Sequence, residues 1–283
     1  MKISTIVLLA ALLSGCAWAP RHGAYRDFYA HLKERPPASE FSESDYFLII
    51  LVSARRLDYF NSQSFLLTMA KHPSDGSLNG DVGHAWVYLQ GKGECLEGGH
   101  SGELGIREPK YFDGIMDLAE SGDPNPIRYL GKTLTDGFFQ QGSGGHLPTY
   151  AVKVDLTKER YEAVREFIEN YDYRHYSLAR RQCVSFAAEA ASLAGLDLEG
   201  QVAMRIDQFI RVGKCRIRLW KDSQYSMLAF DSPDMLEKSL MRTVREGRAE
   251  YALDWYLANS PCCRKYEDWM PTPKRVGRLL QLH

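Results

Sequence analysis

The chain lacks an excess of charge of either sign. Its 35 Lys and Arg residues balance 36 Asp and Glu residues, which gives a formal net charge of −1 at pH 7. It has no long basic run either. A protein that binds nucleic acid through the phosphate backbone needs a concentrated positive surface. The composition therefore argues against nucleic acid as a partner.

Long apolar runs are absent after the first few residues. A helix that crosses a membrane needs about 20 consecutive apolar residues, and the apolar segment Ile3–Leu13 falls short of that length. This segment follows Lys2 and precedes small residues, an arrangement typical of an export signal. The sequence therefore predicts an exported chain that is soluble beyond its signal.

The end of this signal carries a more specific pattern. Residues 13–16, Leu-Ser-Gly-Cys, resemble the lipobox of bacterial lipoproteins. The resemblance implies that residues 1–15 are a signal peptide and that Cys16 becomes lipidated, with palmitate or a similar acyl chain, and tethers the protein to a membrane. Ala17 is not the aspartate that favours inner-membrane retention, so we expect an outer-membrane lipoprotein facing the periplasm. An ordinary secretory signal with a chance cysteine is the alternative.

Cysteines are few, and their number is informative. There are six, and lipidation of Cys16 would leave an odd number in an oxidising compartment, so at least one thiol stays unpaired or forms an intermolecular bridge. A disulfide from the Cys262–Cys263 pair to Cys215 or Cys95 is compatible with the sequence, which does not assign it. The five remaining cysteines are Cys95, Cys183, Cys215, Cys262 and Cys263.

The pattern of apolar residues predicts an α+β fold in which an antiparallel sheet packs on helices. We expect a spacer over 16–44, a catalytic domain over 45–199 and a mostly helical C-terminal extension over 200–283. Strands are predicted at 45–54, 82–89, 94–98 and 149–156. Helices are predicted after the N-cap Thr157, from Cys183 to Gly195, near 233–247 and near 249–259.

Three residues have the chemistry of a cysteine nucleophile and its helpers. Cys183 begins a helix, whose positive end favours a thiolate, and His84 lies on a strand as a possible base. A turn at 90–93 would pair residues whose numbers sum to about 183 and would bring Glu97 close to His84 on one face. Glu97 is our first prediction for the residue that orients the imidazole, and His100 is the second.

The segments "GHAWVYL", "CLEGG" and "RRQCVSFAAEAA" resemble the circularly permuted NlpC/P60 branch of papain-like enzymes, which includes YiiX-type proteins and, more remotely, lecithin:retinol acyltransferase. The resemblance covers about residues 45–196 and implies a permuted papain-like fold. It assigns His84 as general base, Glu97 as orienting residue and Cys183 as nucleophile, with the Cys183 N–H in the oxyanion hole. Gln182 and Tyr176 are expected at the oxyanion hole and substrate cleft.

The expected function is that of an envelope-tethered cysteine hydrolase that cleaves an amide in peptidoglycan stem peptides through a Cys183 thioester. One alternative is an acyltransferase or hydrolase acting on lipid esters or amides. Another is a non-catalytic envelope-binding lipoprotein with a degenerate papain-like fold, in which Cys183 is a core residue, His84 caps a buried strand and Glu97 is an edge charge. No cofactor is expected and the chain is expected to be a monomer. No metal is expected, because the potential ligands match no compact zinc spacing. The potential ligands are His84, Cys95, His100 and Cys183.

Overall fold

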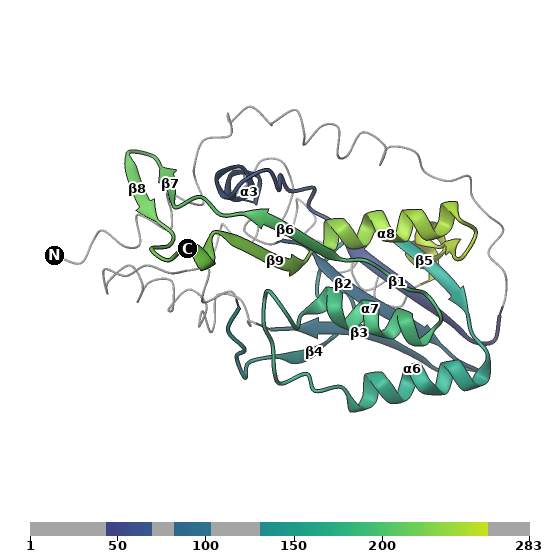
Figure 1. Cartoon of the computed structure of the whole chain (residues 1–283). Helices are drawn as coiled ribbons and strands as arrows, with labels where there is room; N and C mark the ends of the chain where they lie inside the picture. The colour runs from purple at the N-terminus through teal and green to yellow at the C-terminus, as the bar shows by residue number, and fades with distance from the viewer. Residues whose placement is uncertain (1–43, 70–81, 103–130, 260–283) are drawn as a thin grey trace, which may run out of the picture.

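The computed structural model describes residues 44–69, 82–102 and 131–259 (Figure 1). Its centre is a six-stranded sheet in the order β10-β5-β1-β2-β3-β4, and every neighbouring pair in it is antiparallel. The mixed α+β class with a large antiparallel sheet is therefore confirmed. The strands are β1 (Phe47–Ser53), β2 (His84–Gln90), β3 (Cys95–Ser101), β4 (Phe138–Gln141), β5 (Tyr150–Asp155) and β10 (Glu250–Tyr251).

Strand β1 lies in the middle of the sheet, between β5 and β2. Its sequence FLIILVS is apolar up to the final Ser53 and every residue is buried, as expected for a strand that pairs on both edges and is covered on both faces. It pairs with β2 from Phe47 opposite Gln90 to Ser53 opposite His84. On its other edge it pairs with β5. This pairing brings the start of β2 to the end of β1.

Helices cover both faces of the sheet. Figure 1 shows α7 (Cys183–Leu193) over β2 and β3, α8 (Pro233–Arg245) over β1 and β5, and α6 (Lys158–Asn170) beside α7. The opposite face receives α9 (Leu253–Asn259), whose Trp255 ring lies 5.3 Å from the Phe47 ring. The central core lies between these layers.

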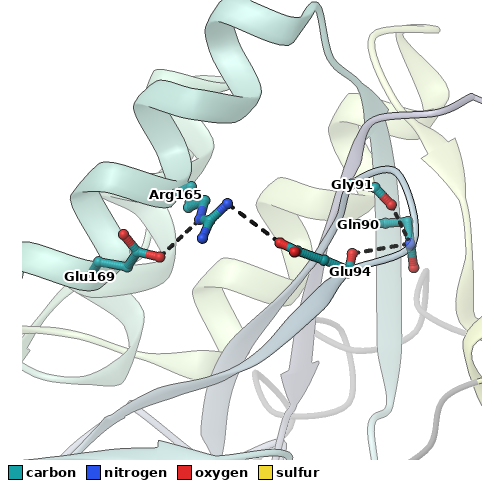
Figure 2. A network of polar contacts seen from close by, with 5 residues as sticks. All are labelled: Gln90, Gly91, Glu94, Arg165 and Glu169. Atoms are coloured by element: carbon teal, nitrogen blue, oxygen red, sulfur yellow. Dashed lines mark hydrogen bonds and ion pairs between the residues drawn. The ribbon is translucent and has the colours of Figure 1, made fainter.

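Helix α6 begins as predicted and is tied to the β2–β3 turn. The Thr157 hydroxyl accepts a hydrogen bond from the third residue of the helix. Figure 2 shows Arg165 between Glu169, at 2.8 Å, and Glu94 of the turn, at 3.4 Å. The Gly91 N–H donates to the Glu94 carbonyl at 2.8 Å and closes the turn at 91–94, one residue later than predicted. Since each residue of shift moves every pair by two, the pair numbers sum to 185.

A smaller unit projects from one end of the sheet. It contains the pair β6 (Gln201–Arg205) and β9 (Met227–Asp231), the hairpin of β7 (Phe209–Val212) and β8 (Cys215–Arg218), and helix α3 (Ser62–Met69). A one-turn 3₁₀ helix, η4 (Ser223–Tyr225), precedes β9. A second cluster of buried side chains holds this unit together: Met204, Ile206, Ile210, Leu219 and Phe230.

The region after residue 200 differs from the prediction. It was expected to be a mostly helical extension, but its described part contains five strands, β6 to β10, besides α8 and α9. The segment "FIRVGKCRIR" alternates apolar and charged residues, which is the period of a strand. Leu236 of α8 and Tyr256 of α9 are fully buried in the central core, and β10 joins the central sheet. Residues on both sides of the predicted boundary at 199 therefore pack in the same core.

One buried carboxylate joins α8 to the end of β1. Asp234 accepts hydrogen bonds from the backbone N–H groups of Arg55, Arg56 and Leu57 at 2.7–2.8 Å, and from the Tyr59 hydroxyl at 2.8 Å. Arg56 takes a positive φ of 58° at this point. A carboxylate that receives several N–H donors stabilises an otherwise unfavourable loop.

In the described ranges no helix is both long and apolar enough to cross a bilayer. The predicted signal peptide, the lipidation site Cys16 and the pair Cys262–Cys263 lie outside these ranges, and so does nearly all of the predicted spacer. Cys95, Cys183 and Cys215 are free thiols.

Candidate functional site

Helix α7 begins at Cys183 because the residue before it caps the helix. Gln182 Oε1 accepts from the Val184 N–H at 2.8 Å, and the Gln182 N–H donates to the Ser185 hydroxyl at 2.9 Å, a reciprocal capping box. Gln182 Nε2 donates to the backbone carbonyl of Asp231 at the end of β9. Gln182 was predicted to contribute to the oxyanion hole. The structure shows it as a buried N-cap whose amide oxygen and amide nitrogen both have partners.

The Cys183 thiol is 5% exposed and donates to Gln182 Oε1 at 3.1 Å. Burial raises the pKa of the thiol to about 12, and the Asp231 carboxylate adds a smaller contribution in the same direction. The N–H groups of Ala85, Val184 and Cys183 itself lower that pKa because they donate to sulfur. The resting thiol is therefore neutral, and backbone donors that would stabilise negative charge surround it.

His84 is the first residue of β2, and a glycine sets its position. Gly83 has a φ of +96°, and a Cβ there would lie 2.3 Å from the Ser53 carbonyl, so only glycine fits this close approach. The imidazole is 5% exposed, and its Nε2 has no hydrogen-bond partner within the described ranges. Burial, followed by the charge of His146, lowers the pKa of His84 to about 3. The ring is therefore a neutral imidazole near pH 7.

The Cys183 thiol and the His84 imidazole both lie near the start of β2, at the seam between β2 and β3, but no hydrogen bond joins them. A Cβ on Gly99 would lie 2.8 Å from the Ala85 carbonyl, so this carbonyl points toward β3. The N–H and C=O of one strand residue point to the same side, and the Ala85 N–H is the one that donates to Cys183 sulfur. His84 Nε2 would lie 3.3 Å from the same Cβ. The imidazole therefore lies beside Gly99 on the face of the sheet that carries Trp86 and α9. The thiol belongs to α7 on the other face and reaches the Ala85 N–H from there.

Glu97 is placed away from this seam. It lies opposite Tyr88, four residues along β2 from His84, which is about 13 Å at the usual rise of a strand. Its carboxylate accepts from the Trp86 indole N–H at 3.3 Å and from the Tyr256 hydroxyl. Trp86 in turn stacks on the His84 ring at 5.8 Å between centroids. The structure therefore places Glu97, our first prediction for the orienting residue, against the Trp86 indole and not against the His84 imidazole.

His100 is fully buried on the α7 side of the sheet. Its Nε2 lies 3.0 Å from the Tyr173 carbonyl, which can only accept, so Nε2 carries the proton and Nδ1 accepts from the Tyr171 hydroxyl at 3.4 Å. Burial lowers the pKa of His100 to about 4. Both ring nitrogens are thus used within an aromatic cluster, which does not fit the predicted orienting role.

Tyr176 belongs to the same cluster. Its ring lies 5.0 Å from the His100 ring and is 8% exposed, and its backbone forms a bridge with Leu134. Tyr176 was predicted in the substrate cleft, but its surroundings are those of a packing residue, as is usual for aromatic side chains before a helix.

His146 lies against His84, although no sequence pattern pointed to it. It follows the glycine-rich turn "QGSGG" before β5, and its ring stacks on His84 at 4.9 Å between centroids with an interplanar angle of 30°. One signal could have found it. Since β5 begins opposite Val52, the residues before Tyr150 lie at the same end of the sheet as His84.

Within the described ranges no group of three or more His, Cys, Asp or Glu residues could hold a metal ion. Comparison of the chain with family models, with curated proteins and with solved structures found no match. The relation to NlpC/P60 enzymes and the roles it assigns therefore remain predictions.

Proposed function

We propose that the protein is a cysteine hydrolase that cleaves an amide bond, with Cys183 as nucleophile and His84 as general base. One observation carries the proposal. The Cys183 sulfur lies at the start of a helix among three backbone N–H donors, one of them the N–H of Ala85, which directly follows His84 in β2. The buried His84 Nε2 is unpartnered in the described part of the chain. A cysteine that served only to fill the core would not need backbone N–H donors at its sulfur or a histidine nearby.

The pKa shifts favour one order of events. Both groups are neutral at rest, since burial raises the pKa of Cys183 and lowers that of His84. In the proposed reaction the thiol leaves Gln182 Oε1 and comes within hydrogen-bond distance of His84 Nε2. Its proton passes to Nε2 as sulfur attacks the carbonyl carbon, without a preformed thiolate. The Cys183 N–H stabilises the oxyanion. His84 then gives the proton to the departing amine, and a thioester remains.

Water completes the cycle. His84 takes a proton from water as the oxygen attacks the thioester carbonyl, and the carbon–sulfur bond breaks. The acid product leaves, and the thiol regains its proton. The rings of Trp86 and His146 stack on the His84 imidazole and keep its orientation fixed during these proton transfers. The proposed substrate class, peptidoglycan stem peptides, follows from the predicted envelope address and the resemblance.

The test uses the full chain and purified peptidoglycan. Wild-type protein should release new muropeptides, and Cys183→Ala should lower the rate by about 10⁴-fold or more. His84→Gln should lower it by about 10²- to 10⁴-fold. Cys95→Ala is the matched control, because Cys95 is an exposed free thiol on β3, and it should keep full activity.

Two results would decide against this substrate or this nucleophile. Unchanged muropeptides with wild-type protein would exclude peptidoglycan. An acyl group found on the Cys183 peptide after incubation with phospholipid would instead support the lipid substrate. Activity that survives Cys183→Ala in a folded protein would exclude the thioester mechanism.

A further inference from the structure

The β7–β8 hairpin gathers three arginines on one exposed face. Residues opposite each other on paired strands share a face, and the register places Phe209 opposite Arg218 and Arg211 opposite Arg216. Ile210 lies on the other face and is buried in the second core. Figure 1 shows the hairpin projecting away from the central sheet. The arginine face is therefore turned away from the core of its own unit.

Among the residues that the structure describes, these arginines have no negative partner. Residues 209–218 hold four basic residues and no acidic residue, although the whole chain is almost neutral. In the described ranges Arg211, Arg216 and Arg218 form no ion pair. Three arginines elsewhere in the described part of the chain do meet a carboxylate: Arg165, Arg242 and Arg248.

The arrangement is unfavourable for the isolated hairpin but suits an anionic ligand. Like charges directly opposite each other destabilise a strand pair, as Arg211 and Arg216 are here. The guanidinium groups of Arg216 and Arg218 lie over the Phe209 ring at 3.7 and 5.3 Å, which limits their freedom before binding. Planar guanidinium forks match the oxygens of a phosphate.

We propose that this face of the hairpin, Phe209, Arg211, Arg216 and Arg218, binds the phosphate headgroups of an anionic lipid bilayer. The predicted lipid on Cys16 selects the bilayer as the partner, because residues 17–44 can span at most about 100 Å even when fully extended. The domain thus stays close to a charged lipid surface. The inference goes beyond the hydrolase activity and does not depend on it.

The experiment places the full chain on vesicles of phosphatidylcholine alone or with phosphatidylglycerol. Hydrogen exchange of 209–218 should slow at least fivefold on the anionic vesicles only, and 0.5 M salt should reverse the effect. Since each basic side chain contributes about fivefold to such binding, the variant Arg211→Gln/Arg216→Gln/Arg218→Gln should lose about 100-fold of the hairpin's affinity. The matched control is Arg165→Gln/Arg242→Gln/Arg248→Gln, which has the same net charge and should behave as wild type.

Several outcomes would overturn the inference. These are equal exchange on both vesicle types, or protection that survives in the hairpin variant. Protection by inorganic phosphate without vesicles would indicate a free-anion site, and protection that grows with protein concentration would indicate a protein partner. Flotation of the same samples reports separately on the predicted anchor. Exchange in α7 verifies that each variant is folded.

Discussion

Replacing Glu237 by glutamine should change how stability depends on pH. Glu237 lies on α8 and is 2% exposed, and its Oε2 has no hydrogen-bond partner in the described ranges. Burial raises the pKa of this carboxyl to about 7, from 4.5. The folded protein therefore keeps a proton that the unfolded chain loses at lower pH. The associated stability is fully present below pH 4.5 and is lost as pH rises through 7.

The size of the effect follows from the shift. A shift of about 2.5 pKa units corresponds to roughly 3 kcal/mol. The free energy of unfolding of Glu237→Gln, relative to wild type, should rise by roughly this amount between pH 4.5 and 8. An amide without a full set of partners adds a cost of about 1–3 kcal/mol at every pH, so only the slope is diagnostic.

Urea unfolding followed by tryptophan fluorescence at five pH values would measure this difference in the free energy of unfolding. The contributions of His84 and His100, whose pKa values are lowered by burial, are common to both proteins and cancel in the difference. Glu162→Gln, an exposed position on α6, is the matched control and should run parallel to wild type. A Glu237→Gln difference that stays constant from pH 4.5 to 8, or that falls, would refute the reasoning.

Two further predictions concern the seam between β2 and β3. Gly99→Ala places a methyl group 2.8 Å from the Ala85 carbonyl and 3.3 Å from His84 Nε2. Hydrolysis should therefore fall at least tenfold, while the melting temperature drops by a few degrees. Full activity of the variant would show that the imidazole does not need this space. His146→Phe keeps a stacked ring but removes a charge that lowers the pKa of His84, so the acid limb of kcat/KM and the NMR titration of His84 should both move to higher pH. An unchanged titration would contradict that electrostatic role.

Local patterns predicted much of the fold. The apolar run of β1, the Thr157 cap of α6 and the helix start at Cys183 are each encoded within a few neighbouring residues. Packing with distant residues hardly affects such features, so the sequence suffices for them. The strands after residue 200 were missed because their alternation is short and their apolar partners lie in other elements.

The site was less predictable, because it depends on register and on contacts between distant residues. A turn one residue later moved Glu97 by two pair positions and out of reach of His84. His146 reaches His84 from 62 positions along the chain, through a turn that shows no periodic pattern. Neither the position of the turn nor the stacking of two rings is encoded in any single segment.

The link between Gln182 and Asp231 has a consequence for the order of assembly. The cap of the Cys183 helix is completed by a residue 49 positions further along the chain. The Tyr256 hydroxyl contacts Glu97 across 159 positions. A chain synthesised amino end first therefore contains strands β1 to β3 before the residues that complete these two contacts have been made. A chain that ended before Asp231 would carry the Cys183 thiol without the contact that completes the cap of its helix.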